Sequence, residues 1–213
     1  MGLVAKDSGD FLTVPPGMHL ARCYRIIDLG TQRSEYMRQE KYGAKVMFQF
    51  EVHGEDDKGK PLQTSDGRPL SIAKSYTVTL SEKSNLRKDL QMWRGREFTA
   101  EELRGFELKN VLGAWAMLTV VHTESNGKTY SNIASVNPVP VNMKKAGMPE
   151  GVNETKMFLI EEPDMALFDT FSENLKKKIE SSPEWQESRG SAPKSSQAPK
   201  APGFEELEDD IPF

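Results

Sequence analysis

The sequence predicts a mainly β protein: a five-stranded Greek-key barrel with a helix between strands three and four, then an amphipathic helix and a disordered acidic tail. Three observations predict this arrangement. Residues 44–52 alternate between apolar and polar side chains, as a strand with one buried face does. The apolar spacing becomes helical over residues 84–95. An Asn-Gly pair at 126–127 then separates two β-rich segments, which predicts a hairpin.

The chain begins with an arm, residues 1–17, that ends in a Val-Pro-Pro-Gly turn sequence. Residues 19–29 carry apolar side chains on both parities, which is typical of a long, curved strand that is buried on both faces. The polar residues 31–41 are predicted to form a loop.

The second strand is the clearest in the sequence. Its predicted core face consists of Ala44, Val46, Phe48, Phe50 and Val52. A Gly-, Asp- and Pro-rich excursion over residues 53–70 leads to a third strand over residues 71–80.

Helical spacing follows the third strand, with Leu86, Leu90 and Trp93 at i, i+4 and i+7. Ser84 is a suitable N-cap and Gly95 a suitable terminator, so we expect a helix between them.

Two more strands complete the predicted barrel. Thr99 and Glu102 have the spacing of a capping box and indicate a short second helix. Residues 111–122 and 128–136 then form the hairpin around the Asn-Gly turn. This order of elements resembles an OB-fold, a small Greek-key barrel with a helix between strands three and four.

The predicted organisation has a nucleic-acid-binding domain over residues 18–140 and a connector with an amphipathic helix over residues 141–180. Apolar residues at helical spacing and a capping Asp164 predict the helix, which either covers the barrel, binds a partner or mediates self-association, leaving a homo-oligomer open. Residues 181–203 are rich in Ser, Pro, Ala and Lys, as flexible linkers are, and residues 204–213 form an acidic tip.

Composition excludes several classes of protein. No apolar run is long enough to cross a membrane, and no signal-peptide pattern begins the chain, so we expect a cytoplasmic protein without a membrane partner. With one cysteine and three scattered histidines, we expect neither a disulfide nor a metal site, and no cofactor. No catalytic motif is present, so we expect a protein that is not an enzyme.

The net charge of −4 hides an asymmetry. Residues 161–213 hold 13 acidic and 6 basic residues, a balance of −7, whereas residues 1–160 hold 19 acidic and 22 basic residues, a balance of +3. A mildly basic body is compatible with phosphate contacts, and an acidic tail can compete with them.

Single-strand binding without sequence preference needs cations for the phosphates and aromatic faces for the bases. Basic and aromatic residues on or beside the predicted strands and the first helix are therefore the candidate DNA-binding residues. They are Arg22, Tyr24, Arg25, Lys41, Tyr42, Lys45, Lys74, Tyr76, Arg87, Lys88, Arg94, Arg96, Trp115, Lys128 and Tyr130.

Each candidate also has a structural alternative. Tyr76 shares parity with apolar residues, and Trp115 is large enough to fill the barrel, so both are also candidates for the core. The basic cluster around Trp93 is also explained by cations near a helix C-terminus. Cys23 is expected to be a small buried apolar residue, and His122 a structural histidine.

The last residues combine an acidic run with an apolar end, and the predicted partner-binding residues are Glu208, Asp209, Asp210, Ile211, Pro212 and Phe213. Ile211 and Phe213 suit a small pocket, and the carboxylates suit basic residues around it. The ending resembles the C-terminal tip of bacterial and phage single-stranded DNA-binding proteins, which docks on partner proteins.

This resemblance implies a non-catalytic protein, encoded by a phage, that protects single-stranded DNA in replication, recombination and repair and recruits proteins of these processes through its tip. One alternative is an interaction protein whose tip occupies host replication proteins without binding DNA. A strand-annealing recombinase or a nuclease is a weaker alternative.

Deletion of residues 205–213 separates the first two hypotheses. A DNA-binding protein retains or strengthens its DNA affinity and loses partner binding, because the acidic competitor and the docking tip are both removed. An interaction protein loses all activity. Titration of the truncated and full-length chains with an oligonucleotide and with a partner measures both effects.

Overall fold

A six-stranded sheet forms the body of the protein, whose computed structural model describes residues 13–36, 39–125 and 127–189. The strands are β1 (Gly17–Tyr36), β2 (Gln39–His53), β3 (Ser71–Thr77), β4 (Trp115–Ser125), β5 (Lys128–Asn137) and β6 (Lys156–Phe158). The order is β3-β2-β1-β4-β5 with antiparallel neighbours, and β6 pairs parallel with β1. The predicted mainly β class is confirmed.

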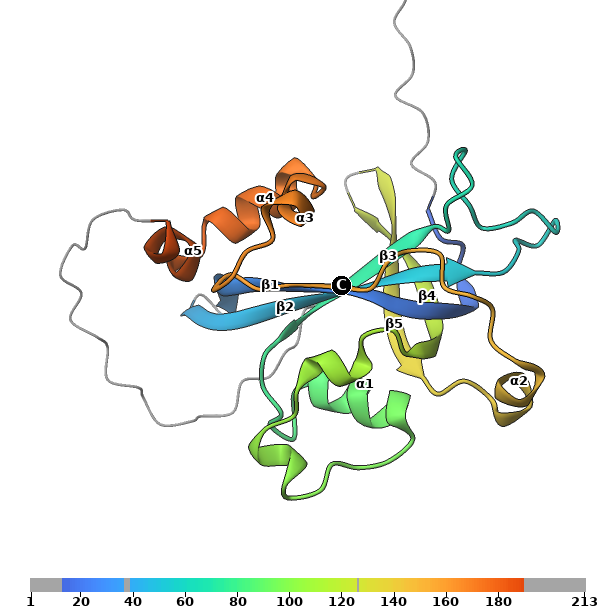
Figure 1. Ribbon diagram of the computed structural model, residues 1–213, viewed down its shortest axis with the longest axis horizontal. Coiled ribbons are helices and arrows are strands. Elements are labelled where there is room, and N and C mark those ends of the chain that lie inside the picture. Colours follow the sequence, from blue (N-terminus) through green and yellow to red (C-terminus); the bar gives the residue numbers. More distant parts are fainter. Residues whose placement is uncertain (1–12, 37–38, 126, 190–213) are drawn as a thin grey trace, which may run out of the picture.

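Helices flank the sheet on two sides. They are α1 (Asn85–Arg94), α2 (Val141–Ala146), α3 (Met165–Asp169), α4 (Glu173–Glu180) and α5 (Pro183–Ser188), with 3-10 turns at Glu102–Arg104 and Leu108–Val111. α3, α4 and α5 lie over β1 and β2, and α1 lies on the opposite side of the sheet (Figure 1). In the part of the chain that the structure describes, no helix combines the length and apolar character needed to span a bilayer.

The predicted closure into a barrel is not confirmed. β3 and β5 are the two ends of the hydrogen-bonded strand order, and the described residues contain no backbone ladder between them. A side-chain contact bridges these strands, because Lys74 Nζ of β3 lies 3.5 Å from the Ala134 carbonyl oxygen of β5.

β1 is the long, curved strand that the sequence predicts, and it is buried on both faces. Its register against β2 shifts between Cys23 and Arg25 and again between Asp28 and Gly30. Residues 20–22 lie between β2 and β4, whereas residues 25–27 pair with β6 on the side away from β2. Such register shifts increase the local bend of a strand.

The first hydrophobic core lies between the sheet and α1. The predicted core residues of β2 are confirmed for Val46, Phe48, Phe50 and Val52, which are all buried, but Ala44 is exposed. The Trp93 ring of α1 packs against Phe50, with ring centroids 5.6 Å apart.

The predicted ends of α1 are confirmed. Ser84 Oγ accepts a hydrogen bond from the Arg87 backbone N–H at 3.1 Å, and Gly95 ends the helix with a φ of 68°. Ser84 and Gly95 thus provide hydrogen bonds for backbone groups at the two helix ends, which have no partner within the helix.

The second core lies between β1 and the C-terminal helices, and it is mostly aromatic. Phe158 of β6 is fully buried there, and its ring centroid lies 5.7 Å from Phe168, 5.2 Å from Phe171 and 6.2 Å from Trp185. Ile27 and Leu29 of β1 form its floor. The segment after β5 is therefore part of the folded body.

The prediction of a single amphipathic helix within residues 164–180 is wrong. Asp164 does cap a helix, but α3 ends at Asp169 and α4 begins only at Glu173. The Thr170 hydroxyl donates to the Leu167 carbonyl at 2.6 Å, and Ser172 caps α4. Such local side-chain bonds compete with helix continuation, and the resulting bend places Phe171 in the second core.

The prediction of a linker over residues 181–203 is wrong for its first residues. α5 lies within the predicted linker, residues 181–203, because Ser182 caps it, Pro183 begins it and the buried Trp185 anchors it. Residues 190–203 and the acidic tip, residues 204–213, lie outside the described residues.

The predicted loop over residues 31–41 is wrong as well. Its described residues extend β1 and β2 into a hairpin, in which Arg33 pairs with Tyr42 and Glu35 with Glu40. The side chains are polar because this hairpin extends beyond the cores, so the sequence lacks the alternation that marks a half-buried strand. An ion pair between Arg33 and Glu40 bridges its two strands.

The described end of the N-terminal arm packs on the β4–β5 hairpin. Val14 is buried, and its carbonyl oxygen lies 2.8 Å from His122 Nε2 and accepts from Ser131 Oγ at 2.7 Å. Through this contact His122 has the structural role that its position predicts.

Gly30 tests the contact between β1 and α5. Its φ is +64°, and a Cβ added there lies 2.5 Å from Ser182 Cβ. We expect Gly30→Ala to lower the free energy of unfolding by more than the roughly 1–2 kcal/mol that a left-handed alanine costs. Gly67→Ala is the matched control, because it has a φ of +80° and no neighbour within 4 Å. Urea unfolding followed by tryptophan fluorescence measures both, and equal losses would contradict the close contact.

Candidate nucleic-acid interface

All the predicted DNA-binding residues lie in the described part of the chain, but many of them have structural partners. Arg22 is the clearest example. It lies opposite Glu51 on β2, with Nη1 and Oε1 3.4 Å apart, and its Nη2 donates to the Asn153 carbonyl at 2.9 Å. Arg22 therefore holds residues 151–153 against the sheet.

Glu51 is the centre of this network and is 0% exposed. Its carboxylate accepts from the Asn153 backbone N–H at 2.7 Å, from the Asn153 side chain at 2.6 Å and from the Val152 N–H at 3.1 Å. Burial raises the pKa of Glu51, but the Asn153 hydrogen bonds, His53 and Arg22 outweigh it and hold this pKa below its ordinary value. Nothing in the sequence distinguishes Glu51, because it lies on the polar parity of β2 as a solvated glutamate would.

Tyr76 and Lys74 of β3 share one carboxylate. The Tyr76 hydroxyl donates to Asp89 Oδ2 at 2.7 Å, and Lys74 Nζ lies 2.7 Å from the same oxygen. Burial and the Asp89 charge raise the pKa of Tyr76 well above its ordinary value. Because Tyr76 is 3% exposed, its core alternative is correct and it is not available for base stacking.

Tyr24 and Trp115 also make side-chain contacts within the fold. Tyr24 is buried, with its hydroxyl 3.4 Å from Gln49 Oε1 and 3.3 Å from Ser71 Oγ. Trp115 is half-buried, and its ring meets His53 edge-on with centroids 4.8 Å apart. Because Tyr24 is buried, the prediction that it stacks on a base is wrong, whereas stacking by Trp115 stays a prediction.

The basic cluster of α1 has partners within the fold at Arg87, Arg94 and Arg96, but these partners are not the C-terminal carbonyls of the helix, as the structural alternative predicts. Arg87 donates to the Leu80 carbonyl at 3.2 Å. Arg94 pairs with Glu102 and lies over the Phe98 ring, and Arg96 donates to Glu102 at 2.7 Å. Lys88 and Arg96 are the exposed candidates of this cluster, whereas Arg87 and Arg94 are half-buried.

Glu102 organises this cluster through the predicted capping box. Its carboxylate accepts from the Thr99 N–H at 3.0 Å, while its own N–H donates to Thr99 Oγ1 at 3.2 Å. The hydrogen bond from Arg96, with those from Thr99 and Arg94, lowers the pKa of Glu102 to about 2. The arginines therefore stabilise this turn.

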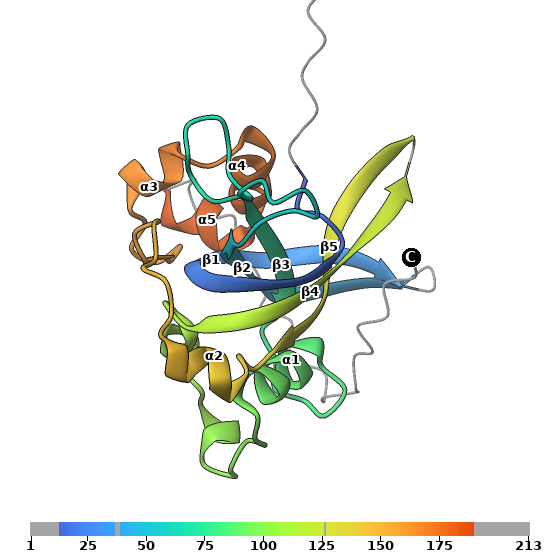
Figure 2. The ribbon, with the colours of Figure 1, turned by 90° about the vertical axis from the view of Figure 1, so that its right-hand side faces the viewer.

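The remaining aromatic candidates are exposed on the two hairpins. Tyr42 of the β1–β2 hairpin is 62% exposed, and Tyr130 of the β4–β5 hairpin is 47% exposed. Lys128 is exposed beside Tyr130, Lys41 is half-buried beside Tyr42, and Lys45 donates to Thr77 Oγ1 at 2.6 Å. Both hairpins project on the right-hand side of Figure 2.

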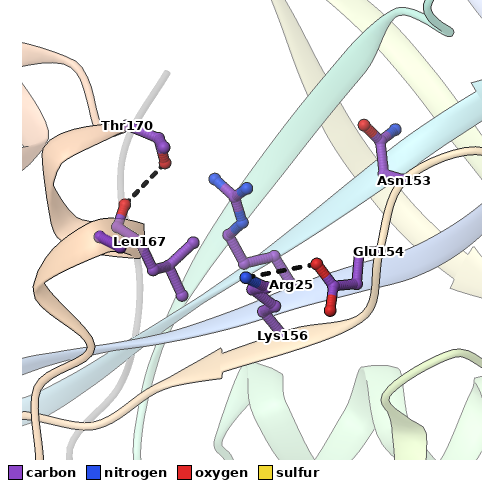
Figure 3. Close-up of a pocket in the computed structure, with 7 residues that line it drawn as sticks. Arg25, Asn153, Glu154, Lys156, Leu167 and Thr170 are labelled. Atoms are coloured by element: carbon purple, nitrogen blue, oxygen red, sulfur yellow. Dashed lines mark hydrogen bonds and ion pairs between the residues drawn. The ribbon is translucent and has the colours of Figure 1, made fainter.

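Arg25 differs from all of these. Its guanidinium lines a pocket between β1, residues 153–156 and α3 (Figure 3). The described residues offer it aromatic rings, Tyr24 and Phe171, but no carboxylate.

The part of the chain that the structure describes includes residues of the types that catalysis often uses. There, no three His, Cys, Asp or Glu side chains are grouped to hold a metal ion. Cys23 is fully buried, and burial raises its pKa to about 12. Asp56 accepts hydrogen bonds from the N–H groups of Lys58 and Lys60 and shapes the turn between β2 and β3.

No protein-family model matches the sequence, and a search of curated proteins finds no match. The resemblance of the C-terminal tip to that of single-stranded DNA-binding proteins therefore stays a prediction.

Glu51→Gln tests the buried network. It leaves the Arg22 guanidinium without its charged partner, so we expect a loss of about 3–5 kcal/mol in the free energy of unfolding at neutral pH. Glu40→Gln, in the exposed pair with Arg33, is the control and should cost less than about 1 kcal/mol.

The pH dependence has a definite sign. Because folding lowers the pKa of Glu51, its contribution is fully present above the ordinary carboxyl pKa, and it is lost as the pH falls through the folded pKa. The wild type should therefore lose more stability in acid than Glu51→Gln. Chemical unfolding at neutral pH and at a pH below about 4 measures this difference, and parallel pH profiles would contradict it.

Proposed function

We propose that the protein binds single-stranded DNA without catalysis and protects it in replication, recombination and repair. Its body acts as an OB-type domain, and its acidic C-terminal tip recruits partner proteins. The observation that carries this proposal is the exposure of Tyr42 and Tyr130 on the β1–β2 and β4–β5 hairpins, which extend beyond the rest of the sheet.

The order of the elements supports the OB type. A helix lies between β3 and β4, and the strand order β3-β2-β1-β4-β5 brings the first and last strands of the path to the Lys74–Ala134 contact. OB-folds are partly open Greek-key barrels, so the missing β3–β5 ladder is compatible with the assignment.

The positions of the exposed tyrosines support binding of a single strand. OB-folds bind oligonucleotides with the loops between strands one and two and between strands four and five. Tyr42 and Tyr130 lie on the corresponding hairpins, with Lys41 and Lys128 beside them. Exposed tyrosine rings stack on any base, and lysines attract the phosphates, so this surface needs no particular sequence.

The tip supports recruitment through its chemistry. Ile211 and Phe213 follow a run of carboxylates, which suits an apolar pocket with a basic rim on a partner. The described body ends at α5, and this helix fixes the point from which the remaining chain starts.

Fluorescence titration with oligo(dT) at two salt concentrations tests DNA binding. We expect tight binding at low salt that weakens steeply as salt rises, because bound phosphates release counterions. Absence of binding at low salt would overturn the proposal.

Two variants test the hairpin surface. Each of Tyr42→Ala and Tyr130→Ala should weaken binding by about 1–3 kcal/mol, the usual contribution of one stacked base. Tyr76→Phe is the matched control, because it changes a buried tyrosine and should leave the affinity of the folded protein unchanged. If both alanine variants bind DNA with the affinity of the wild type, the interface does not include these two tyrosines.

A further inference from the structure

A pocket of about 170 Å³ lies between β1, the chain at residues 153–156 and α3. Two basic side chains line it, Arg25 of β1 and Lys156 of β6, and so does one carboxylate, Glu154, which pairs with Lys156; Leu167 and Thr170 line its α3 end (Figure 3). A water molecule needs on the order of 10–15 Å³ in a cavity. A group as large as a phosphate therefore fits.

The backbone of β1 places Arg25 in this pocket. The register shift between Cys23 and Arg25 leaves Tyr24 without a pairing partner on β2. The Arg25 guanidinium carbon then lies 5.3 Å from the Tyr24 ring centroid and 5.6 Å from that of Phe171. Contacts of a guanidinium with aromatic rings are attractive and leave its N–H groups without hydrogen-bond acceptors.

Arg25 has an unsatisfied hydrogen-bonding capacity. Its Nε is buried without a partner, and within the described residues its guanidinium meets no acceptor oxygen. The other partly buried arginines there are different, because Arg22, Arg87 and Arg94 each donate to a carbonyl or carboxylate oxygen. A half-buried cation with a buried donor that lacks a partner is costly unless an anion complements it.

Lys156 adds a second positive charge at the same point of the sheet. It is the pairing partner of Arg25 in the β1–β6 ladder. Like charges at paired positions of a sheet repel each other. Glu154 lies 3.3 Å from Lys156, but it is 78% exposed, and an ion pair so open to water contributes little. An anion between Arg25 and Lys156 would remove the repulsion.

We propose that this pocket binds a phosphate group through Arg25 and Lys156. A guanidinium offers paired donors that match phosphate oxygens, and the lysine adds a point charge. The source is either a backbone phosphate of the bound strand, which rests on the proposed function, or a free phosphate. A backbone phosphate here extends the interface to the side of the sheet that carries the C-terminal helices.

Inorganic phosphate is the first probe, added to the full-length chain in a low-salt buffer without other multivalent anions. Phosphate should raise the thermal midpoint of the wild type in a concentration-dependent way, because it binds only the folded state. Lys156→Gln should weaken this binding at least about tenfold, as the loss of a charged hydrogen bond does. Arg25→Gln should do the same, and Lys156→Gln keeps the test valid if the Arg25 variant does not fold.

Arg68→Gln is the control, because it also removes one positive charge but from an exposed pair with Asp66 in the loop after β2. It should leave phosphate binding unchanged. If Arg68→Gln and Lys156→Gln lose phosphate binding equally, the proposed phosphate site is wrong, because net charge alone would then explain the effect.

The salt dependence of oligo(dT) binding distinguishes the two sources of the phosphate. If the pocket holds a backbone phosphate, Lys156→Gln lowers the salt slope of DNA binding by about 0.7, the value for one phosphate contact on a single strand. If the slope is unchanged while phosphate binding is lost, the pocket serves free phosphate. If the wild type shows neither phosphate binding nor a slope that depends on Lys156, the inference is wrong, even where DNA binding itself is intact. Failure of the wild type to bind DNA overturns the proposed function instead.

Discussion

β1 lies between two hydrophobic cores, and most of the other elements pack on one of them. Ile26 points into the core that α1 shares, and its neighbour Ile27 points into the core that α3, α4 and α5 share. Successive side chains of a strand alternate between its faces, so two adjacent isoleucines connect both cores. A slip of one residue in the pairing of β1 would exchange the two faces, and this makes its register the central constraint of the fold.

The elements that the sequence predicted well are those with a complete local signal. β2 alternates over residues 44–52, α1 has a cap, an apolar stripe and a terminating glycine, and the β4–β5 hairpin has its turn dipeptide. The errors arose where tertiary contacts decide. The β1–β2 hairpin is polar because it extends beyond the cores, and α5 lies within a sequence of linker composition because Trp185 has an aromatic cluster to join.

The candidate site was less predictable than the fold, for a physical reason. Cations and aromatic rings serve folding as well as DNA binding, and what distinguishes the roles is whether an acceptor lies across the strand. Glu51 opposite Arg22, and Asp89 beside Tyr76, become visible only once the register and the helix position are known. Conversely, Arg25 lacks an acceptor among the described residues because of the side chains that the fold places around it, and the neighbouring sequence does not indicate this.

The buried thiol of Cys23 has a consequence for measurements of this molecule. It is the sole cysteine of the chain, it lies in the first core, and β1 carries it between the paired strands β2 and β4. A thiol-specific reagent can reach it only when the sheet opens around β1, so the modification rate reports how often that opening occurs. The native chain thus carries its own probe of opening kinetics, at the strand that joins its two cores.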